Sequence, residues 1–131
     1  MAGINQTYAL SIKDDASRVI ASDTHVVTGD AEEEFNVTVP GSGSVSVPVS
    51  VDVSNLVAFY VVATKAITMT FNDDGTPDAP SPISLVANVP YWWYTGRGAC
   101  PITIDLAAAN ALKFTKADAT DAVVRGAFLT S

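Results

Sequence analysis

Side chains able to carry chemistry are sparse in this chain of 131 residues. It contains one histidine, His25, and one cysteine, Cys100. A zinc site normally recruits several His or Cys ligands, and catalysis usually needs an acid or base beside a nucleophile or a metal. His25 lies in strand-like sequence and Cys100 lies between apolar neighbours, so we interpret His25 as structural or exposed and Cys100 as an inert thiol.

Two acidic stretches are the remaining candidates for cation chemistry. The run Glu32, Glu33 and Glu34 precedes strand-like sequence, where it is typical of a solvated turn that also discourages edge-to-edge pairing. The loop 72–78 offers oxygen ligands, but Ser81 stands where an EF-hand places its bidentate glutamate. We therefore interpret the loop as a plain turn, with an irregular calcium loop as the alternative.

No carboxylate pair in the sequence is singled out for glycoside hydrolysis. The sequence therefore predicts no catalytic residue, no cofactor and no metal site, and we expect that the protein is not an enzyme. An enzyme with an unrecognised carboxylate pair is the alternative.

Composition narrows the classes of partner. The net charge is −7 and no cluster of Lys and Arg is present, which argues against a nucleic-acid partner. Residues 1–58 hold eight acids and two bases, so we expect more solvated surface there.

The longest apolar run, 56–63, is too short to cross a bilayer, and the N-terminus has no signal-peptide pattern. With 48% hydrophobic and only 16% charged residues, apolar surface must be buried in a sheet-rich core or against a partner.

The dominant pattern along the chain is period-two alternation rich in β-branched residues. Residues 44–54 alternate valine with small polar residues, which predicts one long half-buried strand, at an edge or bulged at Pro48. Residues 34–39 repeat the pattern, and residues 56–64 are apolar on both faces, as in a central strand. Further strands are expected at 7–12, 18–21, 25–28, 67–71, 83–87, 102–105, 111–115 and 123–129.

The segments between these strands carry turn chemistry. We expect turns at 40–43 and 72–75, a stiff extended loop at 76–82 with three prolines, and a single turn or loop at 105–110. Nine or ten short strands with such turns predict an all-β fold, an antiparallel β-sandwich that is jelly-roll-like. By length, residues 1–131 form one sandwich domain.

One segment, 90–101, differs from the rest of the chain because it gathers both tryptophans and two tyrosines. Alternation places Tyr91 and Trp93 on one face of a strand and Trp92 and Tyr94 on the other, so one pair is expected in the core and the other outside. Residues 95–98 turn the chain, with Arg97 at the tip. Trp and Arg are common interface anchors, so Tyr91, Trp92, Trp93, Tyr94 and Arg97 are the candidate partner-binding residues.

Residues 45–131 also carry a pattern known from a protein group: a valine-rich strand, an Asn-Asp-Gly turn followed by Pro-Asp, an apolar strand ending in Pro and Trp, and a final pair of strands. In these features the chain resembles small tailed-bacteriophage virion structural proteins of the capsid cement (decoration) type. It departs from them at 107–109, which is Ala-Ala-Ala. The matching positions are Asn72, Asp74, Gly75, Pro77, Asp78, Leu85, Ala87, Asn88, Pro90 and Trp93.

The resemblance implies a jelly roll, made in the host cytoplasm, that oligomerises on the capsid surface of the virion. Its partners would be the major capsid protein or other virion subunits, and further copies of itself, with neither nucleic acid nor membrane involved. It would stabilise the head lattice by binding across neighbouring subunits. The alternative is a carbohydrate-binding, lectin-like module, or a tail accessory or receptor-binding component, that uses exposed Trp and Tyr rings.

Overall fold

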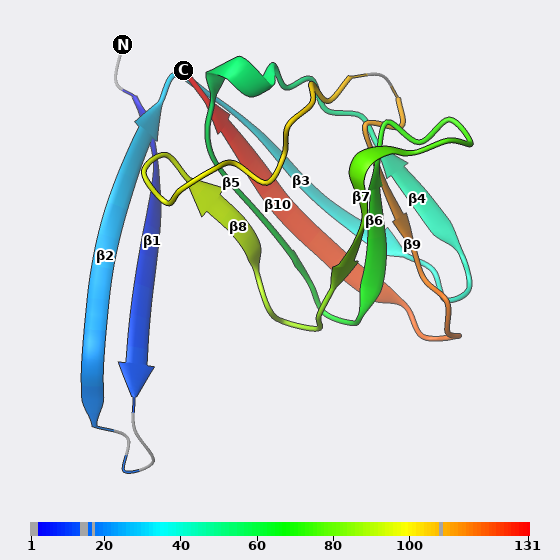
Figure 1. Cartoon of the computed structure of the whole chain (residues 1–131). Coiled ribbons are helices and arrows are strands. Elements are labelled where there is room, and N and C mark those ends of the chain that lie inside the picture. The colour runs from blue at the N-terminus through cyan, green and yellow to red at the C-terminus, as the bar shows by residue number, and fades with distance from the viewer. Residues whose placement is uncertain (1–2, 14–15, 17, 108) are drawn as a thin grey trace.

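Eight strands form two four-stranded antiparallel sheets that pack face to face (Figure 1). The structure is a computed structural model and describes residues 3–13, 16, 18–107 and 109–131. One sheet has the strand order β3-β10-β5-β8 and the other has the order β4-β9-β6-β7. The sheet strands are β3 (Ala31–Val39), β4 (Ser44–Val47), β5 (Leu56–Ala63), β6 (Ile67–Phe71), β7 (Asp78–Leu85), β8 (Tyr91–Tyr94), β9 (Leu112–Thr115) and β10 (Ala122–Thr130).

The pairing of these strands is that of a jelly roll. β3 pairs with β10, β4 with β9, β5 with β8 and β6 with β7, so the first half of the sandwich runs antiparallel to the second half. The four antiparallel pairs are nested along the chain and alternate between the two sheets. The pairs β3–β10 and β5–β8 lie in one sheet, and the pairs β4–β9 and β6–β7 lie in the other. The structure thus confirms the predicted all-β antiparallel sandwich.

The core lies between the two sheets and is built by inward residues at every second position. In β6 the three apolar residues are buried and the two threonines between them are half-buried, as period-two alternation predicts. Aromatic rings fill the centre: Phe59 stacks on Phe128 with ring centroids 5.6 Å apart, and Phe35 stacks on Phe114 at 5.7 Å. This packing fixes the sheet β3-β10-β5-β8 as a rigid platform whose other face points outwards.

One expected strand is shorter than predicted, although it lies at a sheet edge as expected, and another is absent, because the backbone there pairs less than the alternation implied. The strand expected at 44–54 ends at Val47, since Pro48 has no N–H for a ladder; after it, Val51 forms only an isolated bridge with Leu106. The short 3-10 helix η1 (Val53–Asn55), capped by Asp52, then leads into β5. Residues 102–105 form no strand, although Ile102 is buried in the core.

Other boundaries are confirmed or shifted. Residues 105–107 and 109–110 contain no helix, as expected, and 72–75 is a turn with Gly75 at φ +115°. The stiff loop expected at 76–82 is only partly right, since β7 begins at Asp78 and includes two prolines. Proline is tolerated there because β7 is an edge strand.

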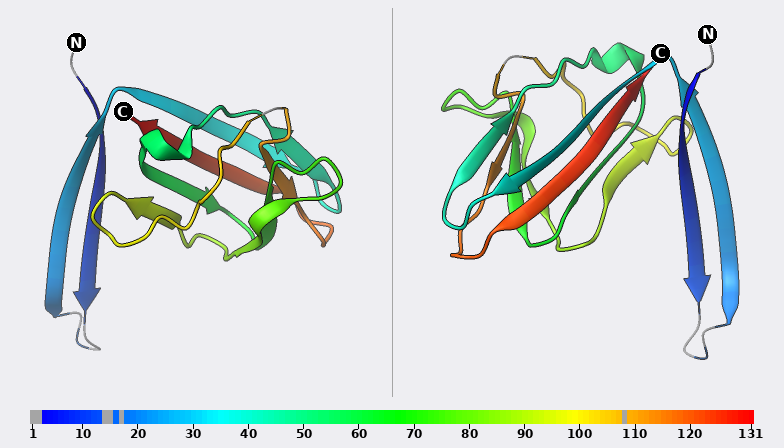
Figure 2. Two further views of the ribbon diagram at one scale, coloured as in Figure 1. Left: turned by 45° about the horizontal axis from the view of Figure 1, so that its top comes forward. Right: turned by 180° about the vertical axis from the view of Figure 1, so that it is seen from behind.

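The N-terminal part of the chain does not belong to the sandwich. β1 (Ile4–Lys13) and β2 (Val19–Gly29) pair only with each other, as a long antiparallel hairpin that leaves the jelly roll near the C-terminus (Figures 1 and 2). The two segments expected at 18–21 and 25–28 are one continuous strand, β2. We call the hairpin β1–β2 the arm. The sandwich itself occupies residues 31–131.

One buried cation at an end of the jelly roll predicts a pH dependence of stability. Lys116 is 3% exposed, and its Nζ donates to Asp118 Oδ1 at 2.5 Å. The same Oδ1 accepts from the backbone N–H and the hydroxyl of Thr120. The hydrogen bond from Lys116, followed by those from Thr120, holds the pKa of the Asp118 carboxyl well below its usual range.

Because the folded state lowers this pKa, the contribution of Asp118 to stability is complete above its unfolded pKa of about 3.9 and is lost as pH falls below it. We expect the Asp118→Asn variant to be less stable than the native chain at pH 7, and to lose less stability between about pH 4 and pH 2. Urea unfolding midpoints across this range measure the effect. Asp74→Asn, in an exposed turn, is the matched control; equal acid dependence of the Asp118→Asn variant and the native chain would contradict the assignment.

Candidate interaction site

The aromatic segment of β8 is divided between the core and the surface. Tyr91 and Trp93 face inwards: Trp93 is 8% exposed, its Nε1 donates to the carbonyl of Gly98, and Tyr91 packs on Phe59 with centroids 5.4 Å apart. Trp92 is on the outer face, opposite Tyr60 of β5. This confirms the predicted alternation and identifies Trp92 as the outward tryptophan. Trp93 thus serves the core and offers little of its ring to a partner, whereas Tyr91 is only partly buried.

The turn after β8 folds back on the strand. Gly96 and Gly98 have φ of +103° and +88°, a conformation that glycine adopts without strain. The guanidinium of Arg97 therefore returns to Trp92: Nη1 donates to the carbonyl of Trp92 at 2.8 Å, and Cζ lies 4.0 Å from the centre of the indole ring. Arg97 is exposed, as expected, but its side chain is held against Trp92 by a cation–π contact.

The outward pair of rings is covered by the arm. Tyr8 of β1 stacks on Trp92 with centroids 5.2 Å apart and planes at 17°, and it also contacts Tyr94 at 5.2 Å. His25 lies opposite Tyr8 in the hairpin and stacks on Tyr94 at 4.3 Å. We call Tyr8, His25, Trp92 and Tyr94 the aromatic clamp. Its contacts give His25 a structural place, as the sequence suggested.

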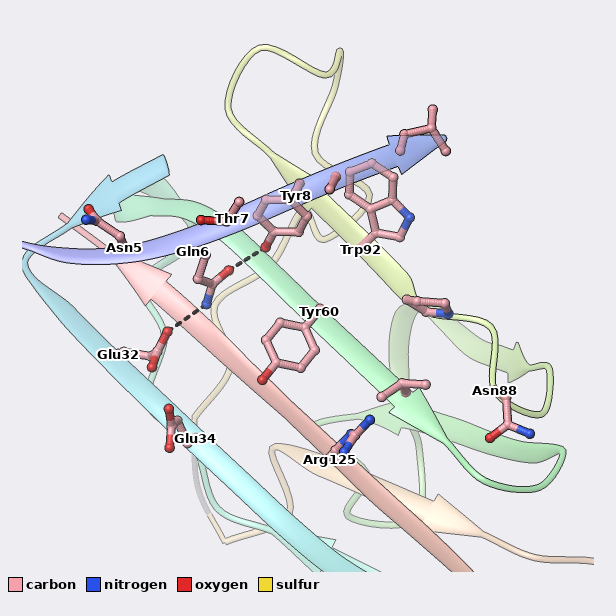
Figure 3. A pocket seen from close by; sticks show the side chains of 14 residues that line it. Asn5, Gln6, Thr7, Tyr8, Glu32, Glu34, Tyr60, Asn88, Trp92 and Arg125 are labelled. Atoms are coloured by element: carbon pink, nitrogen blue, oxygen red, sulfur yellow. Dashed lines mark hydrogen bonds between the residues drawn. The ribbon is translucent and has the colours of Figure 1, made fainter. Parts of the chain in front are cut away.

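Buried contacts beside the clamp fix the base of the arm. Val27 of β2 is 7% exposed and packs with Ala58 and Leu129 of the sandwich. Gln6 is also 7% exposed; its Nε2 donates to Glu32 Oε2 at 2.9 Å, and the Tyr8 hydroxyl donates to Gln6 Oε1 (Figure 3). Burial raises the pKa of the Tyr8 phenol well above its usual range, so this hydroxyl keeps the proton that it donates.

A cleft of about 830 Å³ lies between β1 and the outer face of the sheet β3-β10-β5-β8 (Figure 3). Successive residues 5–10 of β1 border one side. The opposite side is lined by Glu32, Glu34, Tyr60, Val62, Asn88, Pro90, Trp92 and Arg125. The described lining therefore combines apolar and aromatic surface with two carboxylates and one guanidinium.

The two carboxylates belong to β3, where the sequence suggested a solvated turn. Glu32 and Glu34 are two residues apart in a strand and so share the outer face, whereas Glu33 accepts a hydrogen bond from the Ser50 N–H at 2.9 Å. A hydrogen bond with Glu32, together with its charge, raises the pKa of Glu34. The phase of the neighbouring alternation, with Phe35 inwards, was the signal that could have placed these carboxylates.

The other chemical candidates have internal partners. In the turn 72–78, Asp73 Oδ1 accepts from the Gly75 N–H and Asn72 donates to Asp78. Among the described residues no group of three or more His, Cys, Asp or Glu is placed to hold a metal ion. Cys100 is a free, partly buried cysteine, and burial raises the pKa of its thiol. The contacts of Asp73 and Asn72 are those of a plain turn.

The geometry defines a class: an antiparallel jelly roll that carries a projecting N-terminal β-arm held by an aromatic clamp. No protein-family model matches the chain, and no match was found among curated proteins or solved structures. Within the described residues, no helix is long and apolar enough to span a membrane.

Proposed function

We propose that this protein is a structural subunit of a phage virion, of the capsid cement or decoration type, which binds and stabilises the head lattice. The observation that carries the proposal is the arm: a hairpin of ten- and eleven-residue strands that reaches beyond its own jelly roll. An isolated two-stranded hairpin is marginally stable in water, so a long projecting one gains most from covering a neighbouring surface.

Exposed apolar side chains on the arm support an assembly role. Leu10, Val19 and Val26 are each more than half exposed, at 53%, 52% and 53%, and the view from behind shows the end of β1 and the start of β2 well clear of the sandwich (Figure 2). The low charge content of the chain points the same way, because surfaces that dock in a lattice carry few charges at their centre. Binding of many copies across neighbouring subunits would add avidity to a modest contact.

The carbohydrate-binding alternative is less well supported. The rings that would stack on a sugar are engaged within the chain: Trp92 by Tyr8 and Arg97, and Tyr94 by Tyr8 and His25. A titration of tryptophan fluorescence with a panel of glycans separates the two functions. A saturable shift favours the sugar-binding module, whereas a flat response favours the structural subunit.

The direct test is binding to capsids of the encoding phage that were assembled without this protein. We expect the purified chain to co-sediment with them at a saturating ratio and to raise their temperature of disassembly, because a ligand that binds only the assembled state stabilises it. The chain alone, spun under the same conditions, is the control. Neither co-sedimentation nor thermal protection would count against the proposal.

A further inference from the structure

The cleft lies along an open strand edge. Side chains of a strand alternate between its two faces, so a cleft bordered by every residue from Asn5 to Leu10 must run along the edge of β1. β2 occupies the other edge, and the described residues add no third strand to this sheet. In an antiparallel pair, alternate residues direct their N–H and C=O groups away from the partner. About half of the backbone groups of this stretch therefore point towards the cleft.

The dimensions of the cleft suit an extended peptide. Six residues of strand span about 20 Å, which is the usual length of a β-strand in a globular protein. The aromatic clamp and the Gln6–Glu32 hydrogen bond hold this edge at a fixed distance from the platform. A peptide entering the cleft would find backbone partners on β1 and a floor made by Tyr60 and Val62.

The charges of the cleft favour a peptide with basic side chains. Glu32 and Glu34 lie side by side on β3 (Figure 3), and the hydrogen bond with Glu32, followed by its negative charge, raises the pKa of Glu34. A lysine or arginine placed between them would relieve this repulsion. Arg125 is the single basic residue in the described lining, so the cleft remains net acidic.

A second copy of this chain fits these charges poorly. Residues 1–58, which include the arm and β3, contain eight acids and two bases, and the arm-tip sequence 13–18 has as many acids as bases. Pairing two arms would bring acidic segments together. Like charges placed opposite each other across an interface cost roughly several kcal/mol. The preferred occupant is therefore a different chain with positive charge.

We propose that the β1 edge and its cleft accept an extended segment of a capsid subunit, in which lysine or arginine alternates with apolar residues, as an added β-strand. The basic side chains pair with Glu32 and Glu34, and the apolar ones pack on Tyr60 and Val62. The inference rests on the structural role proposed above, because it names the part of a lattice subunit that the arm holds.

The test uses the full chain and a capped six-residue peptide that alternates lysine with valine. We expect saturable binding in calorimetry, with backbone amide shifts at residues 5–10 in an isotope-labelled protein. A peptide with glutamate in place of lysine should not bind measurably. A lysine-valine peptide with proline at two positions should also fail, because proline removes N–H donors from the ladder.

Two charge variants locate the contact. Glu34→Lys is expected to raise the Kd for the lysine-valine peptide at least about tenfold, which corresponds to about 1.4 kcal/mol of binding free energy. Asp74→Lys makes the same charge change in an exposed turn outside the cleft and should bind like the native chain. Equal binding by both variants, equal binding of the proline peptide, or shifts confined to other strands would each overturn the proposal.

Two further measurements separate the alternatives. If the unmixed protein dimerises in sedimentation and its β1 amides change with concentration, a second copy occupies the cleft and the proposal is wrong. If the chain binds capsids but Glu34→Lys binds them equally well, the inference fails while the structural function stands. If the chain binds no capsid at all, the function fails, and the peptide result alone decides whether the edge accepts strands.

Discussion

Replacing Trp92 by alanine is expected to release the arm while the jelly roll stays folded. The substitution removes the ring on which Tyr8 stacks and over which Arg97 lies. An aromatic pair contributes about 0.5–1.5 kcal/mol beyond its buried area, and the apolar contact area lost between Tyr8 and the indole adds roughly 25 cal/mol per Å². Losing about 2 kcal/mol raises the population of the detached arm about 30-fold.

Native-state hydrogen exchange measures this effect residue by residue. We expect amides of β1 and β2 in the Trp92→Ala variant to exchange about 30-fold faster, because a detached hairpin is only marginally stable, whereas amides of β5 and β10 keep their protection. Tyr8→Ala should have a similar effect, and the double variant should fall short of the sum, since both changes remove the same contact. Unchanged exchange in β1 would show that the Gln6–Glu32 bond and Val27 hold the arm without the clamp.

Release of the arm also bears on the proposed function. An arm that moves freely loses its fixed distance from the platform, and ordering it again on binding costs conformational entropy. We therefore expect the Trp92→Ala variant to bind capsids more weakly than Val86→Ala, a truncation of an exposed apolar residue in the loop before β8. Equal capsid binding by the two variants would show that a fixed arm does not contribute to attachment to the lattice.

Local patterns were sufficient to predict the sandwich, but they could not predict the arm. Each strand of the jelly roll buries one face, so alternation in the sequence reports its burial directly, as in β6 and β9. β1 and β2 show the same β-branched and polar alternation, yet their outer faces are exposed, as at Val26 and Leu10. Whether a hairpin joins a sheet or projects from it depends on contacts between residues far apart in the sequence, such as Gln6 with Glu32.

The candidate site shows the same limit. Alternation correctly divided the aromatic segment into an inner and an outer pair, because that division depends only on strand geometry. It could not show that Tyr8 and His25, more than sixty residues earlier, cover the outer pair. Nor could it show that Glu32 and Glu34 border a cleft, because the opposite wall is β1, more than twenty residues earlier in the sequence. Of the side chains predicted to form one contact patch, Trp92 and Tyr94 contact the arm, whereas Tyr91 and Trp93 pack inwards.

Trp93→Ala, one residue along from Trp92→Ala, is expected to destabilise the whole protein. Trp93 is 8% exposed, pairs with Phe59 across β5 and β8, and satisfies the Gly98 carbonyl through Nε1. Truncation of a buried tryptophan leaves a cavity that costs about 3–5 kcal/mol, and here it also leaves one carbonyl without its donor. Urea unfolding should show a lower midpoint with the slope unchanged, and exchange should accelerate in β5 and β10 as well as in the arm. Because both variants remove the same side chain, the comparison isolates position: a loss confined to the arm in Trp93→Ala, or a global loss in Trp92→Ala, would reverse the assignment of the two rings.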